Sequence, residues 1–377
     1  MRLFAALAVS ALLLSPALRA QAPPPPGQPP ATGAVIGFMH AIHATNNVET
    51  TYAFYNKVFG LTTNIAPFTN TAVPILTDSP GVSLRVGMMR LTGDGFNFEL
   101  TEFTGVERHA AQPKVTDPGA PHMKILVKDI DQVVASAKAA GATIVTRSGG
   151  AVTAPTAIGM AKSIVLRDPD GYIVQAIQSS APVQATPAPA RGGAAAAPAA
   201  PSNVVGSIVG ETIGDMAKSM KFWKDQMGVD MQGSDKWMKD KSFADLWGVP
   251  DNTEFRTFNA VFPNTKTANL PTGVRIEWIE FKGTPKTPFS LRVPDPGASG
   301  MAINVADIQN LLPKLKAQGV RAISRNGDLV EWNATTRNVF IKDPDGLNLE
   351  IVGNIGGGAA PARGGAPGAA GAPPAGR

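Results

Sequence analysis

Cysteine is absent from this chain of 377 residues, and charged residues make up only 17% of it. Without cysteine there is no disulfide and no thiol for lipid attachment, so packing alone must stabilise the fold. The hydrophobic fraction of 44% supplies the side chains for such packing, and the length suits two ordinary domains. We therefore expect a folded protein of more than one part, and exclude a disulfide scaffold and a wholly disordered chain.

A basic surface is also lacking, although the formal net charge is +5. Residues 34–180 and 203–354 each contain equal numbers of basic and acidic side chains. The surplus lies outside them, where it forms no basic face. We therefore expect no nucleic-acid partner and no binding to an anionic membrane surface. The surplus charges are Arg2, Arg19, Arg191, Arg363 and Arg377.

No apolar run reaches the roughly 20 residues that a membrane-spanning helix needs. An early run covers residues 3–14, follows Met1-Arg2 and precedes small residues around Ala20. This layout is typical of a secretory signal peptide. We predict cleavage after Ala20, export to the periplasm or the extracellular space, and no membrane anchor.

Three stretches rich in alanine, proline and glycine are unable to form a packed core. They delimit two blocks of similar size, and the prolines of the middle stretch predict a semi-extended tether. We expect the blocks to fold side by side and to be separable there by limited proteolysis. The predicted segments are a signal peptide (1–20), a Pro-rich disordered segment (21–33), a first domain (34–180), a linker (181–202), a second domain (203–354) and a disordered tail (355–377).

The two blocks repeat each other. Asn47 is followed by apolar residues at helical spacing and then by a glycine, and the same pattern follows Asp215. Asp-Pro-Asp-Gly occurs at 168–171 and again at 343–346. These repeats predict an N-capped helix and a hairpin turn in each block. Strand patterns around them predict a strand, a helix and three strands, twice per block, which is an α+β fold.

Several motifs of the first block have a fixed order and spacing. They are His40 seven residues before the helix cap Asn47, Phe54-Tyr55, Phe98-Glu99-Leu100-Thr101, Pro121-His122, and Asp-Pro-Asp-Gly followed by Gln175. On these motifs each block resembles the vicinal oxygen chelate superfamily of glyoxalases, bleomycin-resistance proteins and extradiol dioxygenases. The resemblance implies tandem domains, each made of two βαβββ modules that curve around a cleft.

The resemblance also implies a metal site. The positions of this sequence that correspond to the family's metal-ligand positions in the cleft are His40, Glu99, His122 and Gln175, all in the first block. Two imidazoles and a carboxylate suit one divalent Fe, Mn, Ni, Co or Zn ion. Glu99 is then the candidate catalytic base, because the Gln175 amide cannot take a proton. The alternative for any single histidine is a buried residue with satisfied hydrogen bonds.

The same comparison with the family implies that the second block has lost this site. Its equivalent positions hold Ile208, Glu277, Gly300 and Glu350, which include no imidazole. We expect it to bind no metal, and one interpretation is that it only covers or stiffens the first block. His43 lies three residues from His40 on the same expected strand, so it should point to the opposite face.

The function implied by the resemblance is that of an exported, divalent-metal-dependent lyase, isomerase or dioxygenase. Its substrate would be a small molecule with vicinal oxygens, bound in the cleft of the first domain. A glyoxalase reaction proper is disfavoured, because many relatives have Glu where this chain has Gln175. The alternative is a non-catalytic protein that binds or sequesters a small ligand, as bleomycin-resistance members do. Fold alone does not choose between these functions.

Overall fold

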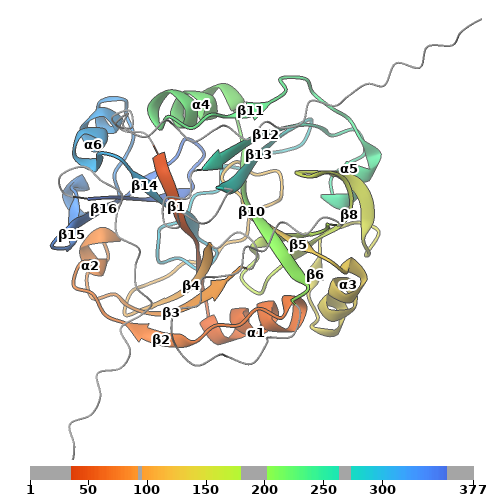
Figure 1. Ribbon diagram of the computed structural model, residues 1–377, viewed down its shortest axis with the longest axis horizontal. Coiled ribbons are helices and arrows are strands. Elements are labelled where there is room, and N and C mark those ends of the chain that lie inside the picture. Colours follow the sequence, from red (N-terminus) through yellow and green to blue (C-terminus); the bar gives the residue numbers. More distant parts are fainter. Residues whose placement is uncertain (1–34, 92–95, 180–201, 263–272, 355–377) are drawn as a thin grey trace, which may run out of the picture. The chain divides into compact units, whose positions relative to one another are not determined.

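The computed structural model describes residues 35–91, 96–179, 202–262 and 273–354 (Figure 1). The predicted signal peptide, Pro-rich segment and disordered tail, and nearly all of the linker, lie outside the described residues. Within those ranges no helix combines the length and the apolar character needed to cross a bilayer.

The described residues form four modules, each of which begins with a strand and a helix. Module one contains β1 (Val35–Thr45), α1 (Val48–Phe59), β2 (Ile65–Phe68), α2 (Val73–Leu76), β3 (Ser83–Arg90) and β4 (Asn97–Thr104). Module two contains β5 (Pro121–Val127), α3 (Ile130–Ala139), β6 (Thr143–Ile144), β7 (Val152–Thr156), β8 (Gly159–Arg167) and β9 (Ile173–Gln178).

The second block supplies the other two modules. Module three contains β10 (Val204–Ile213), α4 (Met216–Met220), the π-helix η1 (Lys221–Gln226), β11 (Gln232–Gly233), α5 (Lys241–Leu246), β12 (Glu254–Phe262) and β13 (Val274–Lys282). Module four contains β14 (Ser299–Val305), α6 (Ile308–Ala317), the 3₁₀ turn η2 (Arg325–Gly327), β15 (Val330–Asn333), β16 (Thr336–Lys342) and β17 (Asn348–Asn354). The predicted α+β class and the four modules are confirmed.

Capping residues determine where the repeated helices begin. The Asn47 side chain accepts a hydrogen bond from the Thr50 amide, and α1 ends at Gly60 in the left-handed conformation with φ 69°. Asp215 caps α4 in the same way, but from Lys221 the chain widens into the π-helix η1. The predicted helix of the second block is thus only partly an α-helix. The strand pairs β8–β9 and β16–β17, which flank the two Asp-Pro-Asp-Gly turns, are antiparallel, as predicted.

The modules pair across the two blocks. Sheet A has the strand order β15-β16-β17-β14-β1-β4-β3-β2, so it joins module one to module four. Sheet B has the order β11-β12-β13-β10-β5-β9-β8-β6, with β7 on β8, and joins module two to module three. The joining strands are β1 with β14 and β5 with β10, both antiparallel (Figure 1).

This pairing corrects the expectation that each block folds as a unit. β1 hydrogen-bonds β14 of the second block on one side and β4 of its own block on the other. Separating the blocks would therefore cut both sheets through their centres and leave unpaired backbone groups on both sides.

Alternation along the strands gives each sheet two different faces. One face of both sheets contributes to a single large core, together with apolar residues of α1, α3 and α6. The opposite face of sheet A carries a second cluster, which includes Ile42 and Ala44 of β1. His40 shares the face of Ile42 and Ala44, whereas His43 lies on the core side against Phe98.

Candidate functional site

The four predicted metal ligands lie on two different sheets. His40 and Glu99 are on β1 and β4 of sheet A, whereas His122 and Gln175 are on β5 and β9 of sheet B. Among the described residues, the three histidine and carboxylate ligands His40, Glu99 and His122 do not come together as one group. Of the predicted ligands, only His40 and Glu99 lie next to each other. Each sheet also brings in a carboxylate from the second block, which is Glu350 in sheet A and Glu277 in sheet B.

In sheet A, His40 meets two carboxylates. Its Nε2 lies 3.3 Å from Glu99 Oε2 and 3.7 Å from Glu350 Oε2. Glu350 is on β17, so β1 and β4 of the first block and β17 of the second each contribute one residue. We call His40, Glu99 and Glu350 the sheet A triad. Its side chains are 4%, 15% and 6% exposed, which leaves Glu99 the most accessible.

Neighbouring polar side chains hold the two carboxylates of this triad. The Thr101 hydroxyl donates to Glu99 Oε1 over 3.0 Å, and the Asn338 amide donates to Glu350 Oε1 over 2.5 Å. In each case the other oxygen, Oε2, is the one nearest His40. The arrangement orients one oxygen of each carboxylate toward the imidazole.

The sheet A triad fits a divalent cation by its chemistry. One imidazole and two carboxylates from three strands are ordinary ligands for a transition metal. Two ligands roughly 2.1 Å from one ion lie about 3–3.5 Å apart, close to the His40–Glu99 distance of 3.3 Å. The Oε2 atoms of both carboxylates lie within 3.7 Å of His40 Nε2. Gly300 leaves the second histidine position without a ligand side chain.

Sheet B has a lysine at the corresponding place. Lys124 Nζ lies 2.5 Å from Glu277 Oε2 and 3.0 Å from His122 Nδ1. We call His122, Lys124 and Glu277 the sheet B triad. All three side chains are buried, and Trp247 packs against both the His122 ring and the Lys124 ammonium. Gln175 donates to the Ser163 hydroxyl of β8, also in sheet B, over 2.9 Å.

Burial governs the protonation of the sheet B triad. Burial lowers the pKa of His122 well below its usual value, and the Lys124 ammonium lowers it further. His122 is therefore neutral, with Nδ1 accepting from Lys124. Burial also lowers the pKa of Lys124, while the Glu277 carboxylate opposes that shift. The pair of ammonium and carboxylate balances its own charge inside the sheet.

A second histidine forms a buried cluster between module one and the hairpin of module two. His43 Nε2 lies 2.9 Å from Asp168 Oδ2 and 3.8 Å from Asp170 Oδ2, and within the described ranges these three residues alone have donor atoms all within 4.8 Å of one another. Tyr55 donates its hydroxyl to Asp168, and Thr51 donates to Asp170. Backbone amides occupy the other carboxylate oxygens.

We read this cluster as structural, although its residue types suit a cation. Hydrogen-bond donors already surround each carboxylate oxygen, so a metal ion would have to displace them. Burial alone would lower the pKa of His43, but the Asp168 and Asp170 carboxylates raise it above its usual value. The cluster is therefore an ion pair that ties the Asp-Pro-Asp-Gly turn to β1 and α1.

The second block repeats this cluster with different chemistry. Glu211 stands where His43 stands, and it faces Asp343 and Asp345 of the second Asp-Pro-Asp-Gly turn. Burial raises the pKa of Glu211 well above its usual value, and the two aspartates raise it further. Burial and Asp343 also raise the pKa of Asp345 to about 6. Three carboxyl groups thus replace the ion pair of the first block.

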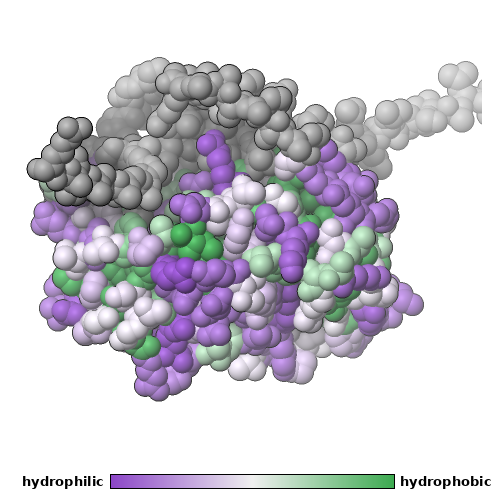
Figure 2. All heavy atoms as spheres, turned by 90° about the horizontal axis from the view of Figure 1, so that it is seen from below, coloured by the Kyte–Doolittle hydropathy of each residue, from purple (hydrophilic) through white to green (hydrophobic). Residues whose placement is uncertain are grey.

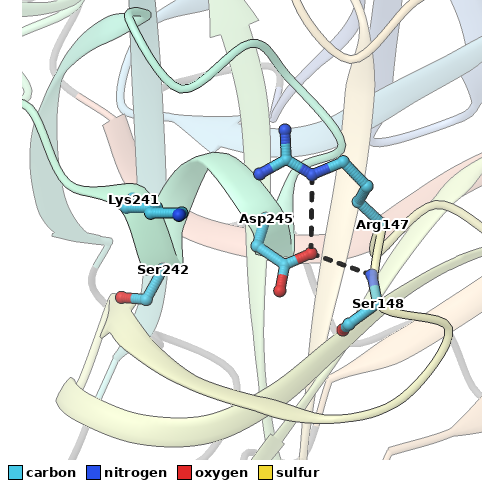
Figure 3. A pocket seen from close by; sticks show the side chains of 5 residues that line it. All are labelled: Arg147, Ser148, Lys241, Ser242 and Asp245. Atoms are coloured by element: carbon cyan, nitrogen blue, oxygen red, sulfur yellow. Dashed lines mark hydrogen bonds and ion pairs between the residues drawn. The ribbon is translucent and has the colours of Figure 1, made fainter.

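A surface hollow of about 530 Å³ is lined by residues that belong to neither triad (Figure 3). It is lined by Arg147, Ser148, Lys241, Ser242 and Asp245. Asp245 accepts from the Ser148 amide over 2.9 Å and lies 3.9 Å from Arg147, and Arg147 also pairs with Asp251 over 2.5 Å, so these lining groups already have protein partners. On the face drawn in Figure 2, hydrophilic side chains are spread widely and the coloured hydrophobic areas between them are small.

The sequence profile of the Glyoxalase/Bleomycin resistance protein/Dioxygenase superfamily matches residues 37–176 and 209–351. The chain belongs to this superfamily. The two matches lie inside the two predicted domains, and the tandem arrangement is confirmed. Superfamily members commonly use a divalent metal and bind small molecules. No curated protein matches the sequence.

Solved structures show the same fold over most of the chain. A single-residue variant of glyoxalase I from Zea mays matches with a TM-score of 0.52 and 19% identity, over 84% of this chain and 93% of that one. Glyoxalase I from Zea mays matches with 0.51 and 17%, over 84% and 92%. A candidate dioxygenase from Bacillus subtilis matches with 0.50 and 12%, over 86% and 87%. At these identities the similarity establishes the superfamily fold.

Sequence reasoning missed two residues of these sites. Glu350 was assigned to a lapsed centre in the second block, whereas it completes the sheet A triad. Lys124 was not singled out, although it is a lone charge in the apolar run of β5 and lies two residues from His122. On a strand that spacing places both side chains on one face, which is the signal that could have revealed the pair.

Proposed function

We propose that this protein is an exported, divalent-metal-dependent enzyme whose active site is the sheet A triad. Its substrate is a small molecule with two neighbouring oxygens, and its reaction is a proton transfer of the isomerase or lyase type. The observation that supports this most directly is the pair of carboxylates, Glu99 and Glu350, whose Oε2 atoms lie 3.3 and 3.7 Å from His40 Nε2. The site is shared by the two blocks and does not belong to the first domain alone.

The pairing of modules changes the argument about acid–base chemistry. Within the first block, Gln175 left Glu99 as the only carboxylate at the predicted site. In sheet A the position across from Glu99 is filled by Glu350, so two groups able to exchange a proton are present. This is the reason for preferring proton transfer over a reaction that needs only a Lewis acid.

The residues of the triad have distinct roles in this proposal. His40, Glu99 and Glu350 would hold the ion, which when bound would polarise the substrate oxygens as a Lewis acid. Glu99 is the base that removes a proton from carbon, because it is the most exposed of the three side chains. Glu350, held by Asn338, returns a proton to the neighbouring atom.

Export and small-molecule binding are further parts of the proposal. The apolar run at 3–14 and the small residues before Ala20 support export. The intact mass of the chain recovered from expressing cells should correspond to a start at Gln21. A mass that includes Met1 in all recovered protein would contradict export by cleavage.

Metal analysis is the first test of the active site. The purified chain should hold or take up about one Mn, Fe, Co, Ni or Zn ion, and His40→Ala should weaken uptake at least tenfold. His122→Ala is the matched control, because His122 belongs to the sheet B triad and should leave uptake unchanged. A chain that binds none of these ions, or that loses its ion with His122→Ala, would overturn the assignment.

Hydrogen exchange is the test of the chemistry. A panel of 2-hydroxyketones and 2-oxoaldehyde adducts, followed by NMR in D₂O, should reveal exchange at the carbon next to the carbonyl. Glu99→Gln and Glu350→Gln should each lower the exchange rate by roughly 10²–10⁴-fold. Tight binding without exchange by any member of the panel would instead favour the ligand-sequestering alternative.

A further inference from the structure

The sheet B triad occupies the place that corresponds to the sheet A triad. Glu277 lies beside Gly210 on the neighbouring strand as Glu99 lies beside Ile42, and Gln175 lies beside Lys124 as Glu350 lies beside Ala302. Sheet B therefore presents His122, Glu277 and Gln175 where sheet A presents its ligands. These are donors of the type that hold a divalent cation.

The side chain of Lys124 already contacts two of these donors, Glu277 and His122. The Lys124 ammonium is 2.5 Å from Glu277 and 3.0 Å from His122, and it is 1% exposed. A buried carboxylate needs a positive partner, and Lys124 is the partner that Glu277 has. Space for the arrangement comes from Gly210, where a Cβ would overlap the His122 ring.

We propose that Lys124 is an internal cation that takes the place of the metal ion in sheet B. Its ammonium neutralises Glu277 and occupies the acceptor atom of His122, so a divalent ion cannot enter without displacing it. The sheet B site is accordingly filled by a side chain of the protein itself. This inference concerns sheet B and holds whether or not sheet A is catalytic.

Removal of the lysine should turn sheet B into an ion site. In Lys124→Ala the Glu277 carboxylate loses its partner, the His122 nitrogen is released, and the shortened side chain leaves room for an ion. Gln175 offers a third donor, because within the described structure its Oε1 is buried and accepts no hydrogen bond. Three ligands and an uncompensated negative charge would then favour a divalent cation.

The experiment is carried out on full chains in which His40→Ala removes the sheet A ligand. Equilibrium dialysis against Co(II) or Zn(II), followed by elemental analysis, should give no bound ion for His40→Ala and about one ion for His40→Ala with Lys124→Ala. Saturating metal should also raise the Tm of the second variant by about 5 °C. Lys124→Leu in the same background is the matched control, because it removes the charge but fills the space without a donor atom.

Two results would overturn the proposal. One is a folded Lys124→Ala variant that binds no ion and whose Tm does not respond to metal. If Lys124→Ala is unfolded without metal, it should fold with Zn(II). Failure to fold at any Zn(II) concentration, while Lys124→Leu with Glu277→Leu folds, is the other contrary result. All of these variants carry His40→Ala, so their results do not depend on sheet A. The active-site proposal is tested separately by the metal content of the wild-type chain.

Discussion

The two triads occupy corresponding places in their sheets but differ in charge. In sheet A the imidazole of His40 faces two carboxylates. In sheet B the imidazole of His122 faces a lysine and a single carboxylate, which balance each other. The strands that carry these residues pair in the same way in both sheets. The two sheets differ in charge at two corresponding places, since Lys124 and Gln175 of sheet B stand where sheet A has Ala302 and Glu350.

The buried clusters beneath the two Asp-Pro-Asp-Gly turns differ in the same manner. His43 makes an ion pair with Asp168, whereas Glu211 brings a third carboxyl group to Asp343 and Asp345. The first cluster is stabilised by attraction between charged His43 and Asp168. In the second, at least one of the three carboxyl groups must be protonated, because three carboxylates would repel one another. The two triads and the two clusters thus occupy repeated positions of the fold, and each of the four has a different set of charged groups.

The largest expected effect is the loss of a carboxylate from sheet B. Glu277→Gln leaves the Lys124 ammonium buried without its partner and should lower the free energy of unfolding by about 3–5 kcal/mol. Glu99→Gln at the matching position of sheet A should change it by less than about 1 kcal/mol when EDTA is present, because the Glu99 side chain is 15% exposed and water can replace part of what is lost. Urea denaturation measures both. Equal losses in the two variants would mean that the triads are electrostatically alike.

A smaller effect separates the two Asp-Pro-Asp-Gly clusters by pH. The folded-state pKa of Asp345 is about 6 and lies above its unfolded value, so the folded state binds the proton more tightly. The stability that this proton provides is present below about pH 4 and is lost as the pH rises through 6. Asp345→Asn should flatten that decline and raise the free energy of unfolding at pH 7 by about 1–2 kcal/mol.

Asp170→Asn is the control for this pH experiment. It removes a carboxylate that supports His43, so it should destabilise the protein at pH 7 while Asp345→Asn stabilises it. Denaturation series from pH 4 to 8 give both curves. Two variants that shift stability in the same direction would show that the clusters do not differ in charge as described.

The smallest effect is expected from a cut between the blocks. Proteolysis within 181–201 should leave the two fragments associated, because β1 pairs with β14 and β5 pairs with β10 across the cut. Size-exclusion chromatography under native conditions should therefore give one peak at the mass of the uncut chain. Fragments that separate without denaturant would restore the view that the blocks are independent.

Local features of the fold could be read from the sequence because local forces determine them. The Asn47 cap, the Gly60 stop and the two-residue alternation of β1 follow from backbone chemistry within a few residues. The same alternation correctly separated His43 from His40. The superfamily and its four modules followed from motif order.

The pairing of modules could not be read from the sequence. The joining strands β1, β5, β10 and β14 are apolar and buried, so each offers a similar edge to any of the others. Nothing within a module selects its partner, and the choice depends on contacts between residues far apart in the chain. For this reason the sequence places His40 and Glu99 with His122 and Gln175, whereas in the structure His40 lies beside Glu99 and Glu350.

The pairing of β1 with β14 also governs when the protein can fold. Ser299 donates its hydroxyl to the Ile42 carbonyl across a separation of 257 residues. The central strand of sheet A must therefore wait, with one edge unpaired, until module four has been synthesised. Topologies with such distant contacts fold slowly, and an open strand edge invites association with other chains. Sheet B, whose joining strands are much closer in sequence, is free to form first and to act as the platform on which sheet A closes.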